Sequence, residues 1–133
     1  MSSPPSPPSP CPCGSGHRYA LCCGRYHDGP LHLQAPDAAS LMRSRYSAYA
    51  LGRLDYVSDT WHASTRPASI EADPPGLTWL GLEVKQHTAQ DAAHATVEFV
   101  ARSKLGGRAH RLHEVSRFVR EGGRWFYLDG TLR

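Results

Sequence analysis

All four cysteines of this 133-residue chain fall within one short stretch near its N-terminus, at Cys11, Cys13, Cys22 and Cys23. A disulfide framework would spread its cysteines over the loops that it cross-links, whereas two close pairs joined by a short loop are typical of a metal site. Zinc takes four thiolates in a tetrahedral arrangement, and a site filled by four protein ligands has no open position for a substrate. The cluster therefore predicts one structural Zn2+ ion.

Two alternatives to the four-cysteine site stay open. In one, His17 or His27 replaces a thiolate and gives a Cys3His site; in the other, the cysteines are reduced and hold no metal. Cys22 and Cys23 are adjacent, and neighbouring side chains in a strand point to opposite faces. Joint ligation by these two cysteines therefore requires a turn or a helix end.

The charge and the hydropathy of the chain argue against two classes of partner. Fifteen Lys and Arg residues against twelve Asp and Glu residues give a formal net charge of only +3, which argues against nucleic acid as a partner. No apolar run approaches the roughly 18 residues that a membrane span needs. Because the N-terminus also lacks the basic and apolar regions of a secretory signal, we expect a cytoplasmic protein with no membrane partner.

Composition divides the chain into four segments. Residues 1–10 are rich in proline and serine and are expected to form a disordered tail. Residues 11–26 are predicted to form the zinc knuckle, and residues 27–36, with their glycine and prolines, a linker. Residues 37–133 are long enough to form a domain with its own core.

The domain begins with a helical pattern. Asp37 is a predicted N-cap, apolar residues follow at spacings of three and four, and Gly52 ends the helix. A shorter helix is predicted over residues 54–61 and a loop over residues 63–76. Helices therefore come first in this domain.

The remainder of the chain reads as strands. Four runs alternate between apolar and polar residues, at 80–85, 95–101, 109–121 and 124–129. The pairs Gly106-Gly107 and Gly122-Gly123 separate consecutive runs and indicate tight hairpins, because primed turns require positive φ. The predicted fold class is α+β, with helices packed on an antiparallel meander.

The hairpins also predict a strand register. If both glycine pairs are two-residue turns, Phe99 pairs with Glu114, and Ser116 pairs with Asp129. One largely apolar face of the sheet then carries two carboxylates in a diagonal relation, about 7 Å apart at the backbone. A slip of one residue would send these side chains to the opposite face.

Aromatic and histidine side chains from the helices complete a predicted recess over this face. The pocket candidates are Tyr46, Trp61, His62, Glu114, Tyr127 and Asp129. Two carboxylates in an apolar recess can bind a cationic ligand or act as acid and base. In the structural alternative the carboxylates pair with Arg43, Arg45 or Arg117, the aromatic rings are core, and His62 has only a hydrogen-bonding role.

The cysteine stretch resembles the SEC-C motif, a zinc knuckle best known from the C-terminal tail of the SecA translocation ATPase. The four cysteines match its ligand positions, and Gly14-Ser15-Gly16 and Tyr19 match the intervening pattern. In SecA this tail engages the chaperone SecB and ribosomes. The resemblance therefore implies a protein or ribosomal partner, which would meet the small basic surface of His17, Arg18 and Arg25.

Five further segments resemble the bacterial YchJ family: residues 41–46, 60–62, 79–82, 116–118 and 127–131. This family joins SEC-C knuckles to a nuclear transport factor 2-like (NTF2-like) domain, and the resemblance covers residues 11–131. It implies a cone-shaped α+β fold with a cavity between helices and a curved antiparallel sheet. Longer members carry a second knuckle at the C-terminus, which residues 24–133 do not contain.

Two functional hypotheses follow. The first is a zinc-binding accessory protein whose knuckle contacts a protein or the ribosome and whose cavity receives a small-molecule ligand. The alternative is a small-molecule enzyme with the acid–base chemistry of a dehydratase or isomerase, which rests on analogy between folds. The enzyme hypothesis requires Glu114, Asp129 and His62 to converge on one accessible pocket.

Overall fold

The computed structural model describes residues 9–133, so most of the predicted Pro/Ser tail lies outside the described residues. A 3-10 turn η1 (Tyr19–Leu21) and a short helix α1 (Gly24–His27) form the knuckle, and helices α2 (Ala38–Leu51) and α3 (Leu54–Asp59) follow. Four strands complete the chain: β1 (Thr78–Ala89), β2 (His94–Leu105), β3 (Arg108–Glu121) and β4 (Arg124–Leu132). The predicted α+β class is confirmed.

Helix α2 begins and ends where its sequence predicts. The Asp37 side chain accepts a hydrogen bond from the Ser40 N–H at 2.7 Å, and Gly52 ends the helix in the left-handed region with φ 73°. Both ends of α2 are thus determined by local chemistry.

Among residues 9–133 no helix is long and apolar enough to cross a membrane.

Helix α3 is shorter than predicted because the residues after it pair with a strand. The Tyr127 N–H donates to the Thr60 carbonyl at 2.8 Å, and the His62 N–H donates to the Tyr127 carbonyl at 2.8 Å. Trp61 and Tyr127 therefore form a parallel bridge. This pairing fixes the end of α3 against β4.

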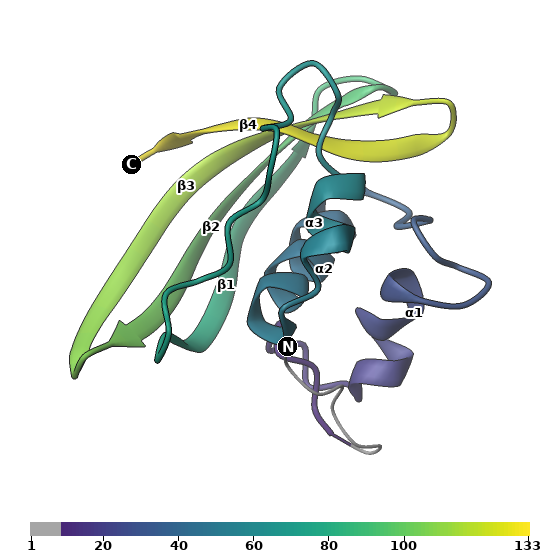
Figure 1. The fold of residues 1–133 in the computed structure, drawn as a ribbon. Helices are drawn as coiled ribbons and strands as arrows, with labels where there is room; N and C mark the ends of the chain where they lie inside the picture. The colour runs from purple at the N-terminus through teal and green to yellow at the C-terminus, as the bar shows by residue number, and fades with distance from the viewer. Residues whose placement is uncertain (1–8) are drawn as a thin grey trace.

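The four strands form an antiparallel meander in the order β1-β2-β3-β4, and the sheet curves over α2 (Figure 1). Both predicted two-glycine turns are present, with φ of 57° and 79° at Gly106 and Gly107 and 59° and 80° at Gly122 and Gly123. Positive φ at both positions is the requirement of a type I′ turn. The predicted pairing of Phe99 with Glu114 is confirmed.

The predicted register between β3 and β4 is correct from the glycine turn back to Phe118 and wrong for the residues of β3 that precede Phe118. Phe118 pairs with Tyr127 as predicted, but a β-bulge follows, and Asp129 pairs with Arg117 instead of Ser116. Because side chains alternate between the faces of a sheet, the extra residue moves Asp129 to the face opposite Glu114. The two carboxylates do not share a face.

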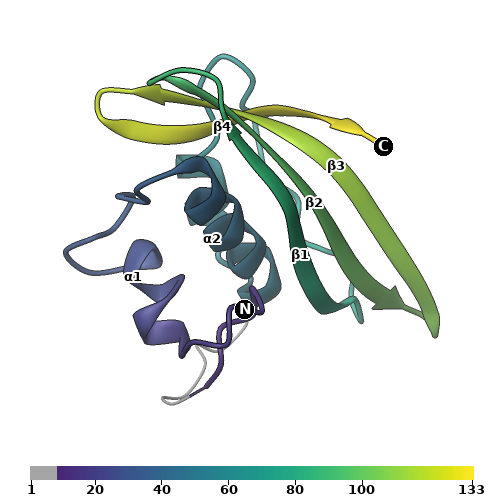
Figure 2. The same ribbon diagram turned by 180° about the vertical axis from the view of Figure 1, so that it is seen from behind.

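Helix α2 lies between the sheet and the knuckle in both views (Figures 1 and 2). It contacts β1, β2 and β4 on one side and α1 on another. The four cysteines belong to the same buried cluster as the core of the domain, which includes Leu41, Tyr56, Val57, Val97 and Phe118. The knuckle is therefore packed onto the domain and shares its core.

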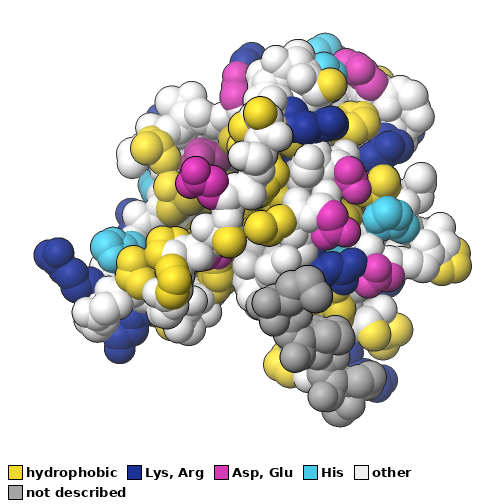
Figure 3. All heavy atoms as spheres, viewed as in Figure 1, with side chains coloured by type: hydrophobic (Ala, Val, Ile, Leu, Met, Phe, Trp, Pro, Cys, Tyr) yellow, Lys and Arg dark blue, Asp and Glu magenta, His cyan; other side chains and the backbone are white. Residues whose placement is uncertain are grey.

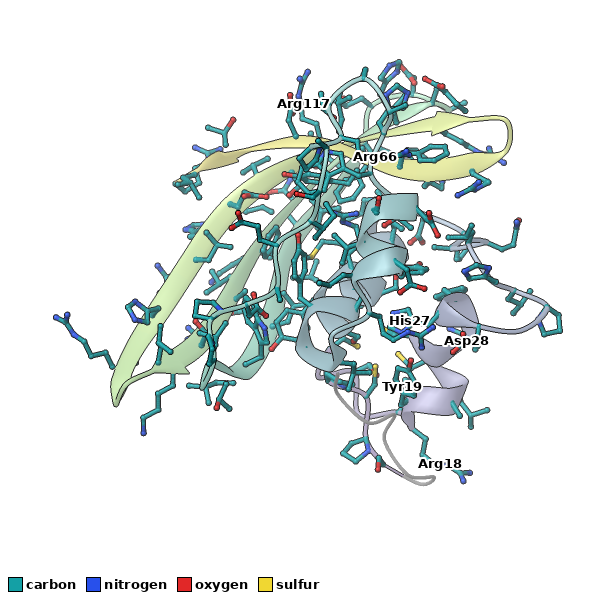
Figure 4. All side chains as sticks on the ribbon, in the orientation of Figure 1. Arg18, Tyr19, His27, Asp28, Arg66 and Arg117 are labelled. Atoms are coloured by element: carbon teal, nitrogen blue, oxygen red, sulfur yellow. The ribbon has the colours of Figure 1, made fainter. Side chains whose placement is uncertain are left out.

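His27, predicted as the first residue of a linker, is instead a buried bridge between the two parts, with 1% of its surface exposed. Its Nε2 lies 2.8 Å from the Ser44 carbonyl oxygen, so Nε2 donates, and its Nδ1 accepts from the Tyr19 hydroxyl at 2.6 Å. Figure 4 shows Tyr19 and His27 between α1 and α2. Burial lowers the pKa of His27 and keeps the ring neutral.

We expect the stabilising effect of His27 to weaken in acid. The folded-state pKa lies below the unfolded-state value near 6.5, so below that pH the unfolded chain binds more protons, and the free energy of unfolding falls by up to about 1.4 kcal/mol per pH unit. Denaturant titrations of the metal-loaded wild type and His27→Gln should show the wild type losing its advantage between pH 7.5 and 5.5. A difference that stays constant over this range would contradict the neutral bridge.

Candidate functional site

The four cysteine sulfurs come together at the junction of knuckle and domain. The Sγ atoms of Cys11, Cys13, Cys22 and Cys23 all lie within 4.8 Å of one another, and those of Cys13 and Cys22 are 3.7 Å apart. The side chains are buried or nearly so, with exposed fractions from 0% to 9%. This group could hold a metal ion.

The chain turns sharply at the second cysteine pair, as the adjacency of Cys22 and Cys23 requires. Cys22 ends η1, and Cys23 is the N-cap of α1. A Cβ atom on Gly24 would lie 2.7 Å from the Tyr19 carbonyl oxygen and 2.9 Å from the Tyr19 ring. Only glycine allows this close approach of residue 24 to Tyr19.

Helix α2 supports the cluster from the domain side. Arg43 Nη1 donates to the Cys13 carbonyl at 3.2 Å, and Ser47 Oγ lies 3.5 Å from Cys11 Sγ. Residues four apart share one face of a helix, so a single face of α2 holds the first cysteine pair. These two contacts were not foreseen from the sequence.

Of the two arginines next to the cysteines in sequence, Arg25 lies near the cluster and Arg18 does not. Arg25 Nε donates to the Cys22 carbonyl at 3.0 Å, whereas Arg18 points away from the rest of the molecule (Figure 4). Arg43 approaches from α2. Arg25 and Arg43 are therefore the cations best placed to offset the charge of several thiolates.

The thiols share protons unequally. Hydrogen bonds from the Cys11 and Cys23 thiols hold the pKa of Cys13 far below its ordinary value. Hydrogen bonding to Cys13 raises the pKa of Cys11, and hydrogen bonding to Cys11 and Cys13 raises that of Cys23. Cys13 is therefore the most acidic of these three thiols.

Neither histidine alternative is supported by this geometry. Both ring nitrogens of His27 are engaged, with Tyr19 and with Ser44. His17 is exposed and does not belong to the group of converging ligands found within residues 9–133. The four cysteines are the ligand set that the fold brings together.

The second candidate site is a cavity of about 240 Å³ between α2 and the concave face of the sheet. Four of the six predicted pocket residues line it: Tyr46, Trp61, Glu114 and Tyr127. Ser116 Oγ donates to Glu114 Oε2 at 2.5 Å. Gly130 provides room for this carboxylate, because a Cβ atom at that position would overlap it.

Asp129 and His62 do not line this cavity. Asp129 accepts from Arg117 Nε at 2.6 Å and from Nη2 at 2.5 Å on the outer side of the sheet, where Figure 4 shows Arg117 pointing away from α2. His62 lies in a separate shallow hollow, 2.7 Å from Glu121 Oε2 and 2.6 Å from Ser64 Oγ. The convergence that the acid–base hypothesis requires is therefore contradicted.

Arg45 is the cavity residue whose role the sequence did not reveal. Its side chain is buried, with 6% of the residue exposed, and burial lowers its pKa to about 10. Nη1 donates to the Val57 carbonyl at 2.8 Å and to Thr60 Oγ1 at 2.7 Å. The available signal was position, since Arg45 falls within the apolar spacing of α2, where a cation is out of place.

Comparison with known proteins identifies both parts of the chain. Residues 37–130 match the model described as the YchJ middle NTF2-like domain, and residues 8–25 match the SEC-C motif. The chain belongs to the YchJ family. Its similarity to these families therefore covers the cysteine cluster and the cavity alike.

Several YchJ-family relatives match along nearly their whole length. A UPF0225 protein of Bordetella parapertussis is 58% identical over 133 residues, which is 100% of both chains. A UPF0225 protein of Methylibium petroleiphilum is 66% identical over 125 residues, covering 94% of this chain and 90% of the relative. Both relatives therefore match all or nearly all of this chain.

Two solved structures share the fold. The solution structure of a SEC-C motif containing protein from Rhodopseudomonas palustris has a TM-score of 0.76 and 35% identity, covering 91% of this chain and 96% of that one. The crystal structure of a SEC-C motif containing protein from Psychrobacter arcticus has a TM-score of 0.75 and 31% identity, covering 92% and 82%. The YchJ-family architecture thus extends over both parts of the chain.

Gly24→Ala should destabilise the YchJ-family fold at the cysteine turn. The added methyl group overlaps the Tyr19 carbonyl and ring, so we expect a loss of about 1–3 kcal/mol in the free energy of unfolding. Gly81→Ala is the matched control, because its Cβ meets nothing within 4 Å and should change stability by no more than about 0.5 kcal/mol. Equal denaturant midpoints for the two variants would contradict the close approach.

Proposed function

We propose that this chain is a zinc protein in which one Zn2+ ion, held by the four cysteines, locks the knuckle onto α2. The observation that carries the proposal is the sulfur geometry. Zn–S bonds of about 2.3 Å give a tetrahedron with edges of roughly 3.8 Å, and the Cys13–Cys22 separation is 3.7 Å. One sulfur pair thus has the spacing of a tetrathiolate site, and all four sulfurs lie within 4.8 Å of one another.

The role of this ion is structural. Four protein ligands fill its coordination sphere, and the bound ion supplies cross-linking of the chain and no open position for a reactant. Residues of α2 orient two of the ligands, and Arg25 and Arg43 lie where they offset negative charge. Reduced thiolates of this kind persist in the cytoplasm, which is the compartment that we propose.

We further propose that the outer surface of the knuckle meets a protein or ribosomal partner. His17, Arg18 and Leu21 are exposed there, Leu21 to 60%, and residues 9–27 contain no Asp or Glu. Figure 3 shows basic and acidic side chains interspersed over one whole face of the molecule. A small apolar and basic surface favours a local contact with a partner over general binding of nucleic acid.

The cavity completes the proposal as a binding site for a small ligand. It combines aromatic walls with a few polar groups, which is the usual composition of a small-molecule site. Among its polar side chains, Arg45 comes from α2 and Glu114 from β3. We propose binding, and no reaction step, because the predicted acid–base residues are dispersed.

Metal analysis tests the zinc site. The purified chain should contain one equivalent of zinc, and Co2+ substitution should give the charge-transfer absorption of four thiolates. Cys13→Ser should lose the ion and a large share of the folding free energy, because metal binding and folding are coupled. Ser15→Ala, which removes only a hydroxyl 3.2 Å from Cys22 Sγ, is the control and should keep the ion. Well under one equivalent of zinc in the wild type would contradict the proposal.

Affinity recovery with quantitative mass spectrometry, and co-sedimentation with purified ribosomes, test the partner. Arg18→Glu reverses the charge of a side chain that points away from the fold, so it should abolish partner recovery and leave zinc content unchanged. Arg111→Glu, an exposed residue of β3, makes the same charge change on the sheet and should have no effect. Equal recovery with both variants would contradict a knuckle interface.

A further inference from the structure

We propose that the cavity binds a small aromatic carboxylic acid that also carries a hydrogen-bond donor. Its carboxylate lies at Arg45, its ring lies between the aromatic walls, and its donor faces Glu114. This inference rests on the proposed role of the cavity as a ligand site. It is independent of the zinc ion and of the knuckle surface.

Arg45 is a buried cation without an anionic partner. Among residues 9–133 no carboxylate forms an ion pair with it. Its guanidinium group lies 4.5 Å from the centroid of the Tyr127 ring and 5.2 Å from that of Trp61. Rings and two neutral acceptors compensate a buried charge less well than a carboxylate does. An anionic ligand would supply the missing partner.

A second group on the same wall also lacks a partner. The indole N–H of Trp61 is buried and donates to no acceptor within the described part of the chain. The Trp61 ring lines the cavity and packs against the Arg45 guanidinium. A buried donor without an acceptor is rare and costly. The Arg45 guanidinium against the Trp61 ring marks the wall of the cavity at which we place the acidic group.

The opposite wall contributes a carboxylate that needs a donor. Ser116 Oγ already donates a hydrogen bond to Glu114 Oε2, and the absence of a side chain at Gly130 lets the carboxylate lie against β4. An apolar ligand edge at this position would desolvate the carboxylate without a replacement bond. A hydroxyl or amino group on the ligand avoids this cost. The other lining acid, Asp73, already accepts from Trp79 Nε1 at 2.8 Å.

Cavity size and wall chemistry limit the body of the ligand. The volume of about 240 Å³ corresponds to roughly eight water molecules at liquid density, which suits a single ring with short substituents. Tyr46 and Trp79 pack edge to face with centroids 5.3 Å apart, as do Trp61 and Tyr127 at 5.0 Å. These rings offer both faces and edges to an aromatic guest.

The relative burial of the charged side chains in the lining favours an acid over an amine as the ligand. Arg45 is the most deeply buried charged side chain of the lining, whereas Asp73 and Glu114 are half-buried. Electrostatic interactions strengthen as water is excluded. The carboxylate–guanidinium contact therefore dominates recognition, and the contact with Glu114 selects among acids.

Three related probes test the inference on the zinc-loaded full chain. Para-hydroxyphenylacetate has the acid, the ring and the donor; phenylacetate lacks the donor; tyramine replaces the acid by an amine. Titration calorimetry should rank their affinities in that order, with steps of about tenfold for each charged hydrogen bond lost. Chemical-shift changes on binding should concentrate on Ala101 and Phe118, which line the cavity.

Two variants connect the ranking to residues. Glu114→Gln should lower the affinity for para-hydroxyphenylacetate to that for phenylacetate, and it should leave the affinity for phenylacetate unchanged. Arg45→Met should abolish acid binding; because Arg45 also supports α3, the Glu114 variant keeps the test valid if Arg45→Met does not fold. Asp129→Asn, on the outer face of the sheet, is the control and should match the wild type.

Each failure has a separate meaning. Tyramine binding as tightly as the acids, or tighter, would overturn the inference while the cavity remains a ligand site. Absence of binding by all three probes would overturn both the inference and the ligand role of the cavity. Equal affinity of the two acids in the wild type would overturn the assignment of a donor at Glu114.

Discussion

A helix buried on two sides holds the two parts of this molecule together. One face of α2 receives the first cysteine pair through Arg43 and Ser47, and another lines the cavity with Tyr46. The small residues Ala38 and Ala48 are fully buried, which lets neighbouring segments approach the helix closely. Because both sites share this helix, a change in its position would alter cluster and cavity together.

The two sides of α2 differ in how their polar groups are satisfied. On the knuckle side, Ser44 accepts from His27 through its carbonyl, and its hydroxyl lies 2.8 Å from the Tyr56 hydroxyl. On the cavity side, Arg45 is buried, and no carboxylate of residues 9–133 forms an ion pair with it. A satisfied network stabilises one arrangement, whereas an unpaired charge favours the binding of a group from outside. The difference agrees with a structural role for the knuckle side and a binding role for the cavity side.

Prediction from sequence succeeded for the convergence of the four cysteines and only in part for the cavity. Four cysteines at close spacing indicate their own convergence, because ligand spacing is a local property. Glu114 was placed correctly by the first hairpin, but Asp129 was not, because a bulge shifts the second pairing by one residue. Arg45 was considered only as a partner for the sheet carboxylates, and its burial was not predicted because it depends on segments that are distant in the chain.

Local chemistry in the sequence determined the cysteine cluster, both ends of α2, the two glycine turns and the α+β class. Each depends on residues within a few positions of one another: a side chain that caps a helix, a φ that only glycine adopts readily, or thiols joined by a short loop. The tertiary structure decided the bulge beside Phe118, the pairing of Trp61 with Tyr127, the burial of His27 and the burial of Arg45. These features arise where strand β4 and helix α2 pack against segments far away in the chain, and no local pattern records that packing.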